Sequence, residues 1–318
     1  MKRTDVRRFG GEIVNELQRE RKITCFLMVL LVTGWGLEYV VAKKALEVLE
    51  PLSLLFFKYL VGFLVVWAIK LKQESKIVFN LKDFPIFILC AITGEIFYFY
   101  CEYSAMSYMP ISLITIILAF VPGVSMIIER IVYKKKASRK MLIGLLFCIL
   151  GVAFVIGVDF KILLKGRIIG YLLVFAAIFS WNAYNFVTAS LRGKYSDITL
   201  TFNQLLCTIL LTFPYAVQHR APIEVFTPDV IGGIIYLGVF TAGLGFIIQV
   251  KSLYILGPTT TSLFSNFMPI AATFFGWIFL KESISLLQII GGIVVISAGY
   301  VVVKEKGKME ELSNESES

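Results

Sequence analysis

Charge and histidine are scarce in this 318-residue sequence, and its cysteines are never closely paired. Charged residues make up 17% of the chain and there is one histidine, whereas soluble domains carry about 25% charged residues. The five cysteines fall in or beside apolar segments, none in Cys-x-x-Cys spacing, which is typical of small buried side chains. The sequence therefore offers neither a disulfide framework nor a cluster of metal ligands, and we expect no metal and no cofactor.

The sequence also lacks the motifs of common enzyme classes. It contains no His-Glu-x-x-His, no Gly-x-Ser-x-Gly, no phosphate-binding loop and no Asp-rich cluster. Such motifs carry metal-dependent, hydrolytic and nucleotide-dependent chemistry. We therefore expect neither an enzyme nor an ATP-driven pump, and a membrane-embedded lipid-modifying enzyme is the weaker alternative.

Long hydrophobic runs are present in their place. Hydrophobic residues make up 58% of the chain, its mean hydropathy is +0.80, and about 20 apolar residues cross a bilayer as a helix. The runs are too long and too little alternating for barrel strands, so the sequence predicts an all-α membrane protein with ten transmembrane helices. The expected spans are 23–42, 51–71, 84–106, 110–128, 141–158, 168–189, 198–217, 230–250, 259–280 and 285–303.

Basic residues are unevenly distributed between the loops. The net charge is +9, and most Lys and Arg lie near the N-terminus, in the tail and in alternate loops such as KLKQESK and ERIVYKKKASRK. This asymmetry is the positive-inside pattern, so we expect both termini in the cytosol of a multi-pass protein of the plasma (inner) membrane. The basic charge then faces lipid headgroups, which makes the lipid bilayer the partner rather than nucleic acid.

The two halves of the chain carry the same pattern. Trp35 and Trp181 are each followed, at equal intervals, by a polar residue inside the next span, Lys58 or Gln204. Each half holds five spans, so the second half enters the membrane in the opposite orientation, as in the inverted repeats of secondary transporters. The predicted organisation is a cytosolic N-terminal segment (1–22), a first five-helix repeat (23–158), a second five-helix repeat (168–303) and a disordered cytosolic tail (304–318).

Several short motifs resemble those of a known family. The sequence has WGLEYV in its first span, PLSLLFFK opening its second, a proline late in the fourth and ninth, and LKESISLLQIIGGIVVISAG at the last. In this order they resemble ten-helix members of the drug/metabolite transporter superfamily, of the EamA type. The resemblance implies transport of amino acids or other small metabolites, mostly outward. The sequence departs from the pattern at Lys58, where arginine is usual, at Glu38, often a small or amide residue, and at Lys134, where a glutamate like Glu282 is expected.

Ionisable side chains inside membrane spans mark functional sites because they are expensive to keep there. In an α-helix four residues of the third span share one face, Glu95, Tyr98, Phe99 and Glu102, and we expect this face to point toward protein or a water-filled cavity. Two roles remain open for the glutamates: neutralising Lys58, or loading and releasing a proton during transport. Glu102 and Glu38 are favoured for the proton, and Glu95 is expected nearer a membrane face. The candidates for proton coupling or an ion pair are Glu38, Lys58, Glu95 and Glu102.

Aromatic, amide and hydroxyl side chains supply the remaining candidates. Tryptophans well inside their spans favour a cavity wall over an interfacial belt, whereas the amides either orient a substrate or hold helices together. Pro122 and Pro269 lie at matching places and predict helix kinks, which free a carbonyl and point to a binding site. The predicted substrate-binding residues are Trp35, Glu38, Tyr98, Glu102, Trp181, Asn185, Ser265 and Asn266.

Together these features predict a secondary active transporter. We expect it to move a small polar or amphipathic metabolite, amino acid-like or drug-like, across the plasma membrane by proton-coupled export with alternating access. Its partners are then the bilayer, a small-molecule substrate and protons. A passive facilitator of the same fold is the main alternative, because coupling rests only on the glutamates within the spans.

Overall fold

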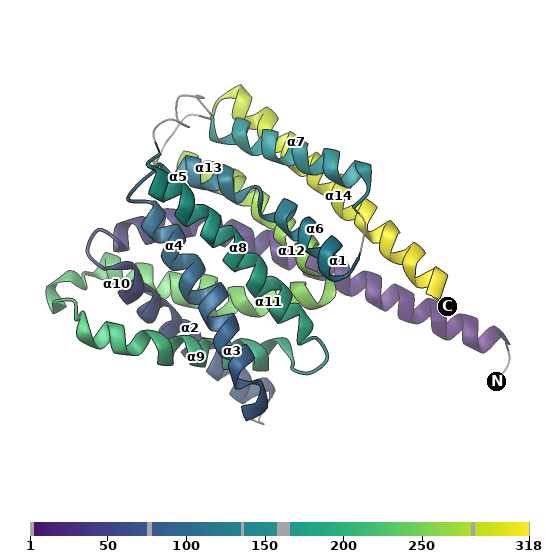
Figure 1. Ribbon diagram of the computed structural model, residues 1–318, viewed down its shortest axis with the longest axis horizontal. Coiled ribbons are helices and arrows are strands. Elements are labelled where there is room, and N and C mark those ends of the chain that lie inside the picture. The colour runs from purple at the N-terminus through teal and green to yellow at the C-terminus, as the bar shows by residue number, and fades with distance from the viewer. Residues whose placement is uncertain (1–2, 75–77, 135–136, 158–165, 281–283, 318) are drawn as a thin grey trace.

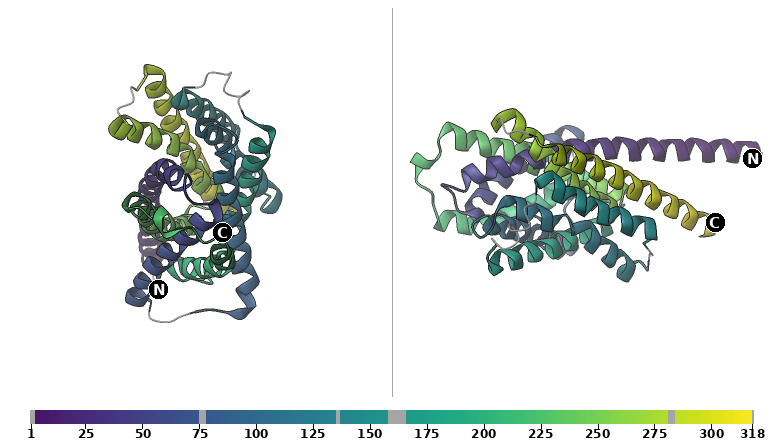
Figure 2. Two further views of the ribbon diagram at one scale, coloured as in Figure 1. Left: turned by 90° about the vertical axis from the view of Figure 1, so that its left-hand side faces the viewer. Right: turned by 90° about the horizontal axis from the view of Figure 1, so that it is seen from above.

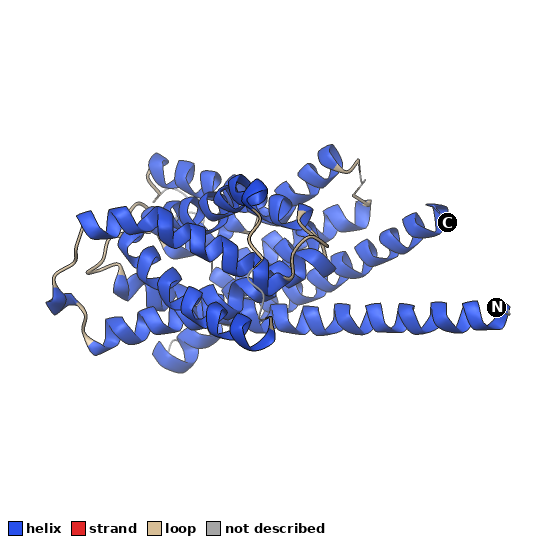
Figure 3. Cartoon of the chain, turned by 90° about the horizontal axis from the view of Figure 1, so that it is seen from below, coloured by secondary structure: helices blue, strands red, loops and turns tan. Residues whose placement is uncertain are grey.

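The computed structural model describes residues 3–74, 78–134, 137–157, 166–280 and 284–317. In these ranges the chain forms helices joined by loops, without a strand (Figures 1 and 3). The hydrophobic runs explain this, because a helix satisfies its own backbone hydrogen bonds in lipid. The helices are α1 (Arg3–Ala45), α2 (Pro51–Gln73), η1 (Leu81–Asp83), α3 (Phe84–Cys90), η2 (Ala91–Phe97), α4 (Tyr98–Ala105), α5 (Ile111–Leu118), α6 (Val121–Val132), α7 (Arg139–Ile156), α8 (Ile168–Ser190), α9 (Asp197–Gln218), η4 (Ile223–Val225), α10 (Pro228–Tyr236), η5 (Leu237–Leu244), α11 (Gly245–Ile255), α12 (Pro258–Leu263), η6 (Phe264–Phe267), α13 (Met268–Leu280) and α14 (Leu286–Glu317).

Within the described residues, nine helical segments are long and apolar enough to cross a membrane. They correspond to nine of the ten predicted spans. The remaining span, 259–280, coincides with α12, η6 and α13, which follow one another without a loop. The short 3-10 turn η6 interrupts the α-helix there, so this span is helical but not one regular helix. The prediction of an all-α membrane protein is confirmed.

The ends of the chain depart from the predicted organisation. Helix α1 begins at Arg3, so the predicted N-terminal segment and the first span form one continuous helix. Helix α14 continues to Glu317, through a tail that the sequence predicts to be disordered. Glu, Lys, Met and Leu are good helix formers, which explains why the polar tail extends the apolar helix. The two termini lie at the same end of the molecule (Figures 1 and 2).

The α-helix is interrupted just before each of the two prolines at which the sequence predicts a kink. In the fourth span α5 ends at Leu118 and α6 begins at Val121, with Pro122 in the first turn of α6. In the ninth span Pro269 lies in the first turn of α13, directly after η6. Proline lacks the amide hydrogen, and the first turn of a helix is where this loss costs least. Each proline therefore follows an interruption in its span.

The third and eighth spans each contain a π-helical segment, η2 and η5, at corresponding places in the two halves. Helix α2 packs closely against η5. A Cβ atom at Gly238 would lie 2.4 Å from the Cβ of Val61 and 3.0 Å from the carbonyl oxygen of Lys58. Only glycine permits this approach, which fixes the part of α2 that carries Lys58.

Helices α7 and α14 lie side by side along one edge of the molecule (Figures 1 and 2). Their backbones nearly touch, since a Cβ atom on Gly291 would lie 2.7 Å from the carbonyl oxygen of Gly151. The buried ion pair of Glu38 with Lys58, and the carboxyl group of Glu102, lie elsewhere, among α1, α2 and α4.

Candidate functional site

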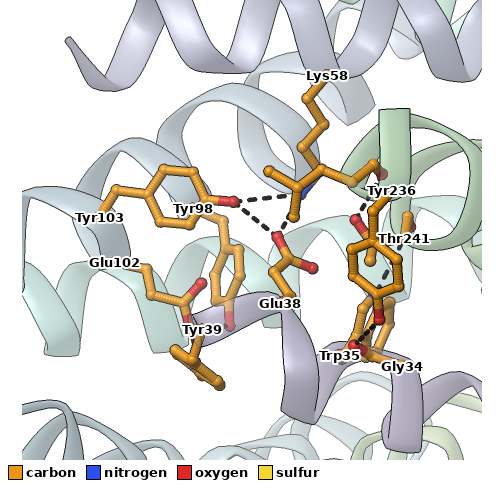
Figure 4. Close-up of polar contacts among 11 residues, drawn as sticks. Gly34, Trp35, Glu38, Tyr39, Lys58, Tyr98, Glu102, Tyr103, Tyr236 and Thr241 are labelled. Carbon is orange, nitrogen blue, oxygen red and sulfur yellow. Dashed lines mark hydrogen bonds and ion pairs between the residues drawn. The ribbon is translucent and has the colours of Figure 1, made fainter. Parts of the chain in front are cut away.

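A buried ion pair joins the first two spans. The Lys58 ammonium of α2 lies 2.6 Å from an oxygen of Glu38 on α1, and the Tyr103 hydroxyl of α4 donates to the same oxygen at 2.6 Å (Figure 4). Lys58 is 0% exposed, and its ammonium also lies 3.7 Å from the centre of the Phe99 ring, within the range of a cation–π contact. The glutamate that meets Lys58 therefore comes from the first span and links α1 to α2.

Glu102 occupies a different environment on the same side of α4. One carboxylate oxygen accepts hydrogen bonds from the hydroxyls of Tyr39 at 2.7 Å and Tyr98 at 3.1 Å. The residue is 4% exposed, and within the described ranges it contacts no lysine or arginine. Of the two carboxylates in this region, Glu102 is thus held by neutral donors, whereas Glu38 is held by a cation.

The π-helical segment η2 separates the two glutamates of the third span. An α-helix would place Glu95 and Glu102 on one face, but π hydrogen bonds reach one residue further and change the rotation along the helix. Glu95 accepts a hydrogen bond from Thr208 of α9 and is 0% exposed. The expectation that Glu95 and Glu102 share one face is therefore wrong, because Glu95 faces α9 and is absent from the cavity wall that contains Glu102.

Aromatic rings enclose the space beside Glu38 and Glu102. The Trp35 and Trp181 rings meet edge to face with centroids 5.9 Å apart, and the Tyr98 and Trp181 centroids lie 4.7 Å apart. This brings the equivalent tryptophans of the two halves together. The cavity between these groups has a volume of about 30 Å³, which is room for about one or two water molecules. It is lined by Trp35, Glu38, Tyr39, Tyr98, Phe99, Glu102, Tyr103, Trp181, Ser265 and Met268.

The other predicted binding residues divide between the cavity and the protein interior. Ser265 lines the cavity and donates its hydroxyl to the Ser262 carbonyl at 2.6 Å. Asn266 is buried beside Cys148 of α7 and is not part of the cavity wall. Of the two neighbours in sequence, only Ser265 faces the site.

Asn185 belongs to a separate network of buried polar side chains. It accepts a hydrogen bond from Gln249 of α11 at 3.0 Å and donates one to Ser262 of α12 at 3.2 Å. The Ser262 hydroxyl in turn lies 2.9 Å from that of Ser125 on α6, which donates to Asn182. This amide network, as we call Ser125, Asn182, Asn185, Gln249 and Ser262, joins four helices away from the cavity wall.

Four of the lining residues are not among the substrate-binding residues that the sequence predicts. Tyr39 and Tyr103 each directly follow a candidate glutamate, and their hydroxyls donate to the carboxylates of Glu102 and Glu38 respectively. An aromatic donor next to each buried acid was the available signal. Phe99 belongs to the stripe predicted for the third span, but it carries no polar group. Met268 also carries none, and nothing in its local sequence distinguishes it from a packing residue.

One end of the bundle is closed by polar contacts between α2 and α9. Glu74 accepts hydrogen bonds from Thr199 at 2.6 Å and Ser196 at 2.9 Å, and Lys70 donates to Thr199 at 2.6 Å. Partial burial raises the pKa of Glu74, but the hydrogen bonds from Thr199 and Ser196 and the charge of Lys70 outweigh it, so this pKa lies below its usual value. At the other end of the same helix pair, Tyr215 donates to Glu50. Both ends of the α2–α9 contact are thus held by hydrogen bonds across the two halves.

A helical bundle with many spans, two equivalent halves and a cavity at the place where the halves meet is typical of secondary transporters. Comparison with known proteins agrees. The model of the EamA-like transporter family matches residues 22–157 and 168–304, one match in each half, and the chain belongs to this family.

Curated relatives match most of the chain at low identity. An "Uncharacterized transporter" of Archaeoglobus fulgidus is 22% identical over 88% of this chain and 98% of its own length. The "Uncharacterized transporter YoaV" of Bacillus subtilis is 20% identical over 82% of this chain and 90% of its own. A solved structure titled "Crystal structure of protein" superposes with a TM-score of 0.70 at 15% identity, covering 89% of this chain and 96% of that one. The chain is a multi-pass membrane transporter, and the likeness to the solved structure supports its fold.

Proposed function

We propose that the chain is a secondary active transporter that exports a small amphipathic metabolite across the plasma membrane in exchange for protons. The observation that carries this proposal is the aromatic cavity with Glu102 in its wall. This carboxylate is held by two tyrosine hydroxyls and lies where Trp35 and Trp181 of the two halves meet. Substrate sites of repeat-built transporters are expected at such an interface between halves.

The charges in the cavity wall favour a substrate with an ammonium group. The charge of Glu38 is balanced by Lys58, and Lys58 itself is buried and absent from the lining. The lining then carries one unbalanced negative charge, at Glu102, and no positive one. An amine on an apolar or aromatic body fits both the carboxylate and the rings, since aromatic faces attract cations. The carboxylate of an anion or a zwitterion would meet no cation in this wall.

Alternating access follows from the size of the cavity. A space for about one or two water molecules holds no metabolite, so the side chains must separate before a substrate enters. The hydrogen bonds of Glu74 and Lys70 to α9 at one end, and of Tyr215 to Glu50 at the other, are the contacts that opening would break. With both termini in the cytosol, the first of these ends faces the cytosol.

Transport in proteoliposomes tests the proposal. Tyramine, tyrosine and 3-(4-hydroxyphenyl)propionate share one phenol and differ in charge, being a cation, a zwitterion and an anion at neutral pH. We expect an imposed pH gradient to drive uptake of tyramine and not of the anion. Glu102→Gln should abolish the response to the gradient while leaving exchange, and Glu47→Gln, at an exposed site, is the matched control.

The outcomes separate the alternatives. Uptake of tyramine that ignores the pH gradient in the parent and in Glu102→Gln identifies a passive facilitator. Preference for the anion contradicts the role of Glu102 in substrate binding. If none of the three compounds is taken up and tyramine does not quench tryptophan fluorescence, the proposed substrate class is wrong.

A further inference from the structure

Glu95 is a third buried carboxyl group that the cavity does not use. It lies in η2, and it is absent from the cavity wall that contains Glu38 and Glu102. Its side chain instead faces α9 of the second half, where the Thr208 hydroxyl donates to one of its oxygens. The same hydroxyl oxygen lies 3.1 Å from the carbonyl oxygen of Gln204 in its own helix. Glu95 therefore lies between the two halves of the molecule, at a place separate from the proposed substrate site.

The hydrogen bonding of Glu95 is incomplete. The residue is 0% exposed, and its second oxygen has no hydrogen-bond partner within the described part of the chain. The Tyr59 hydroxyl of α2, also 0% exposed, likewise lacks a hydrogen-bond partner there. Among the acidic side chains, Glu95 has the strongest electrostatic interaction with this hydroxyl. Two buried polar groups without a protein partner in one region of the core point to a site for a small bound species.

The groups that face Glu95 do not supply a compensating charge. Segment η2 packs against α2, α3, α4, α8 and α9. Among the described residues, the cation that acts on Glu95 is Lys58, whose ammonium contacts Glu38 instead. On α4, Glu102 is held by Tyr39 and Tyr98. The remaining titratable groups that face Glu95 are Tyr59 on α2, Cys90 on α3, Tyr184 on α8 and Cys207 on α9.

The bound species that best fits Glu95 is a proton. A buried, unpaired carboxylate is far more costly than a neutral carboxylic acid, which needs only hydrogen bonds. Hard metal cations such as Ca²⁺ and Mg²⁺ require about six or more oxygen ligands, and the described residues contain no group of three or more acidic, histidine or cysteine side chains that could hold a metal ion. A single proton on the free oxygen of Glu95 makes it a donor and removes the unpaired charge.

We propose that Glu95 and Thr208 form a proton-binding site between the two halves, distinct from the substrate cavity and occupied in this conformation. Segment η2 supports a functional role, since π-helical turns often mark functional sites and η5 repeats the feature at the matching place in the second half. Movement of α9 away from η2 would take Thr208 with it and admit water, which releases the proton. The participation of Glu95 in coupling rests on the proposed transport function, but the occupancy of the site does not.

Infrared spectroscopy of the purified full-length protein in lipid nanodiscs tests the occupancy directly. A protonated carboxyl group has a C=O stretch well separated from the bands of an ionised carboxylate. At pH 7 we expect the spectrum of Glu95→Gln to lose a carboxylic-acid band that the parent protein has. The exposed Glu47→Gln should lose carboxylate bands instead, and Thr208→Val should shift the acid band without removing it.

Two results would overturn the proposal. If Glu95→Gln loses carboxylate bands at pH 7, Glu95 is ionised in the parent. If the acid band disappears when sodium replaces a bulky organic cation in the buffer, the site takes a metal ion in place of a proton. Because Gln is nearly isosteric with Glu and also accepts a hydrogen bond from Thr208, the variant keeps the packing, and far-ultraviolet circular dichroism verifies this.

A transport measurement separates this inference from the proposed function. If the chain transports tyramine, Glu95→Gln should shift the pH dependence of gradient-driven uptake while tyramine still quenches tryptophan fluorescence as in the parent. Glu102→Gln should instead weaken the quenching. If the chain transports none of the test compounds, the infrared result still decides whether Glu95 holds a proton.

Discussion

The two halves of the molecule are alike in backbone and different in chemistry. The first half places carboxylates, a lysine and tyrosine hydroxyls in the core of its spans, and the second half places amides and small hydroxyls there. Gln204 stands where the first half has Lys58, and it donates to the Thr188 hydroxyl at 3.2 Å, within its own half. The amide network likewise meets its donors with acceptors across four helices.

This difference separates two kinds of polar interior. Neutral amides hold helices together by hydrogen bonds of modest strength that do not depend on pH. The carboxylates of the first half change charge when a proton binds, so their contacts respond to pH and to a charged ligand. We infer that the first half carries the chemistry of the site and the second half completes its walls.

Among the substitutions that test this difference between the halves, Lys58→Met should reduce the stability of the protein most. The substitution leaves the Glu38 carboxylate buried without its cation, and removing one partner of a buried pair costs about 3–5 kcal/mol. Unfolding in mixed micelles should report this loss of stability. The double variant with Glu38→Gln should recover most of it, and a double variant no more stable than the single one contradicts the assigned pairing.

Gly238→Ala should have the next largest effect. Its methyl group would overlap Val61 and approach the Lys58 carbonyl, and overpacking of this kind costs about 1–3 kcal/mol. Gly232→Ala in α10 is the matched control, because nothing lies within 4 Å of its added methyl group and alanine favours the helix. Equal stability of the two variants would show that α2 and η5 do not pack closely.

Asn185→Ala should sharpen the contrast between the halves. The substitution breaks the hydrogen bonds to Gln249 and Ser262, and such bonds between membrane helices average about 0.6 kcal/mol with a maximum near 1.7. Stability should fall by roughly this amount, while the pH dependence of transport stays as in the parent. A shifted pH profile would mean that the second half also contributes to coupling.

The smallest effect concerns Glu74 at the end of the α2–α9 contact. Its folded-state pKa lies below the usual value because hydrogen bonds from Thr199 and Ser196 and the charge of Lys70 outweigh partial burial. Its contribution to stability is therefore complete above the ordinary pKa of glutamate and disappears as the pH falls through the lower, folded-state value. Thr199→Val should reduce this loss on acidification, measured as the pH dependence of the unfolding midpoint, and an unchanged slope argues against the contact.

The spans and the repeat could be predicted from the sequence, because length, hydropathy and matching tryptophans act over whole segments. The location of Glu38 beside Trp35 also follows from their spacing in sequence, because residues three apart share one face of a helix. The position of Glu95 could not be predicted, because the π-helical turns of η2 change the direction in which its side chain points. No residue pattern in the segment AITGEIF predicts such turns. The partner of Lys58 remained open for a related reason. Spacing along the sequence does not distinguish Glu38, Glu95 and Glu102, and only the three-dimensional arrangement, which brings Glu38 of α1 to 2.6 Å from Lys58, selects one of them.

The contracted cavity has a consequence for any measured affinity. If the protein spends most of its time with Trp35, Trp181 and Tyr98 in contact, the observed dissociation constant is the intrinsic one divided by the fraction of molecules that are open. Substitutions far from the cavity that weaken the contacts at either end of α2 and α9 should then tighten binding without touching the ligand. A variant that binds more strongly but transports more slowly would carry the signature of a shifted resting conformation.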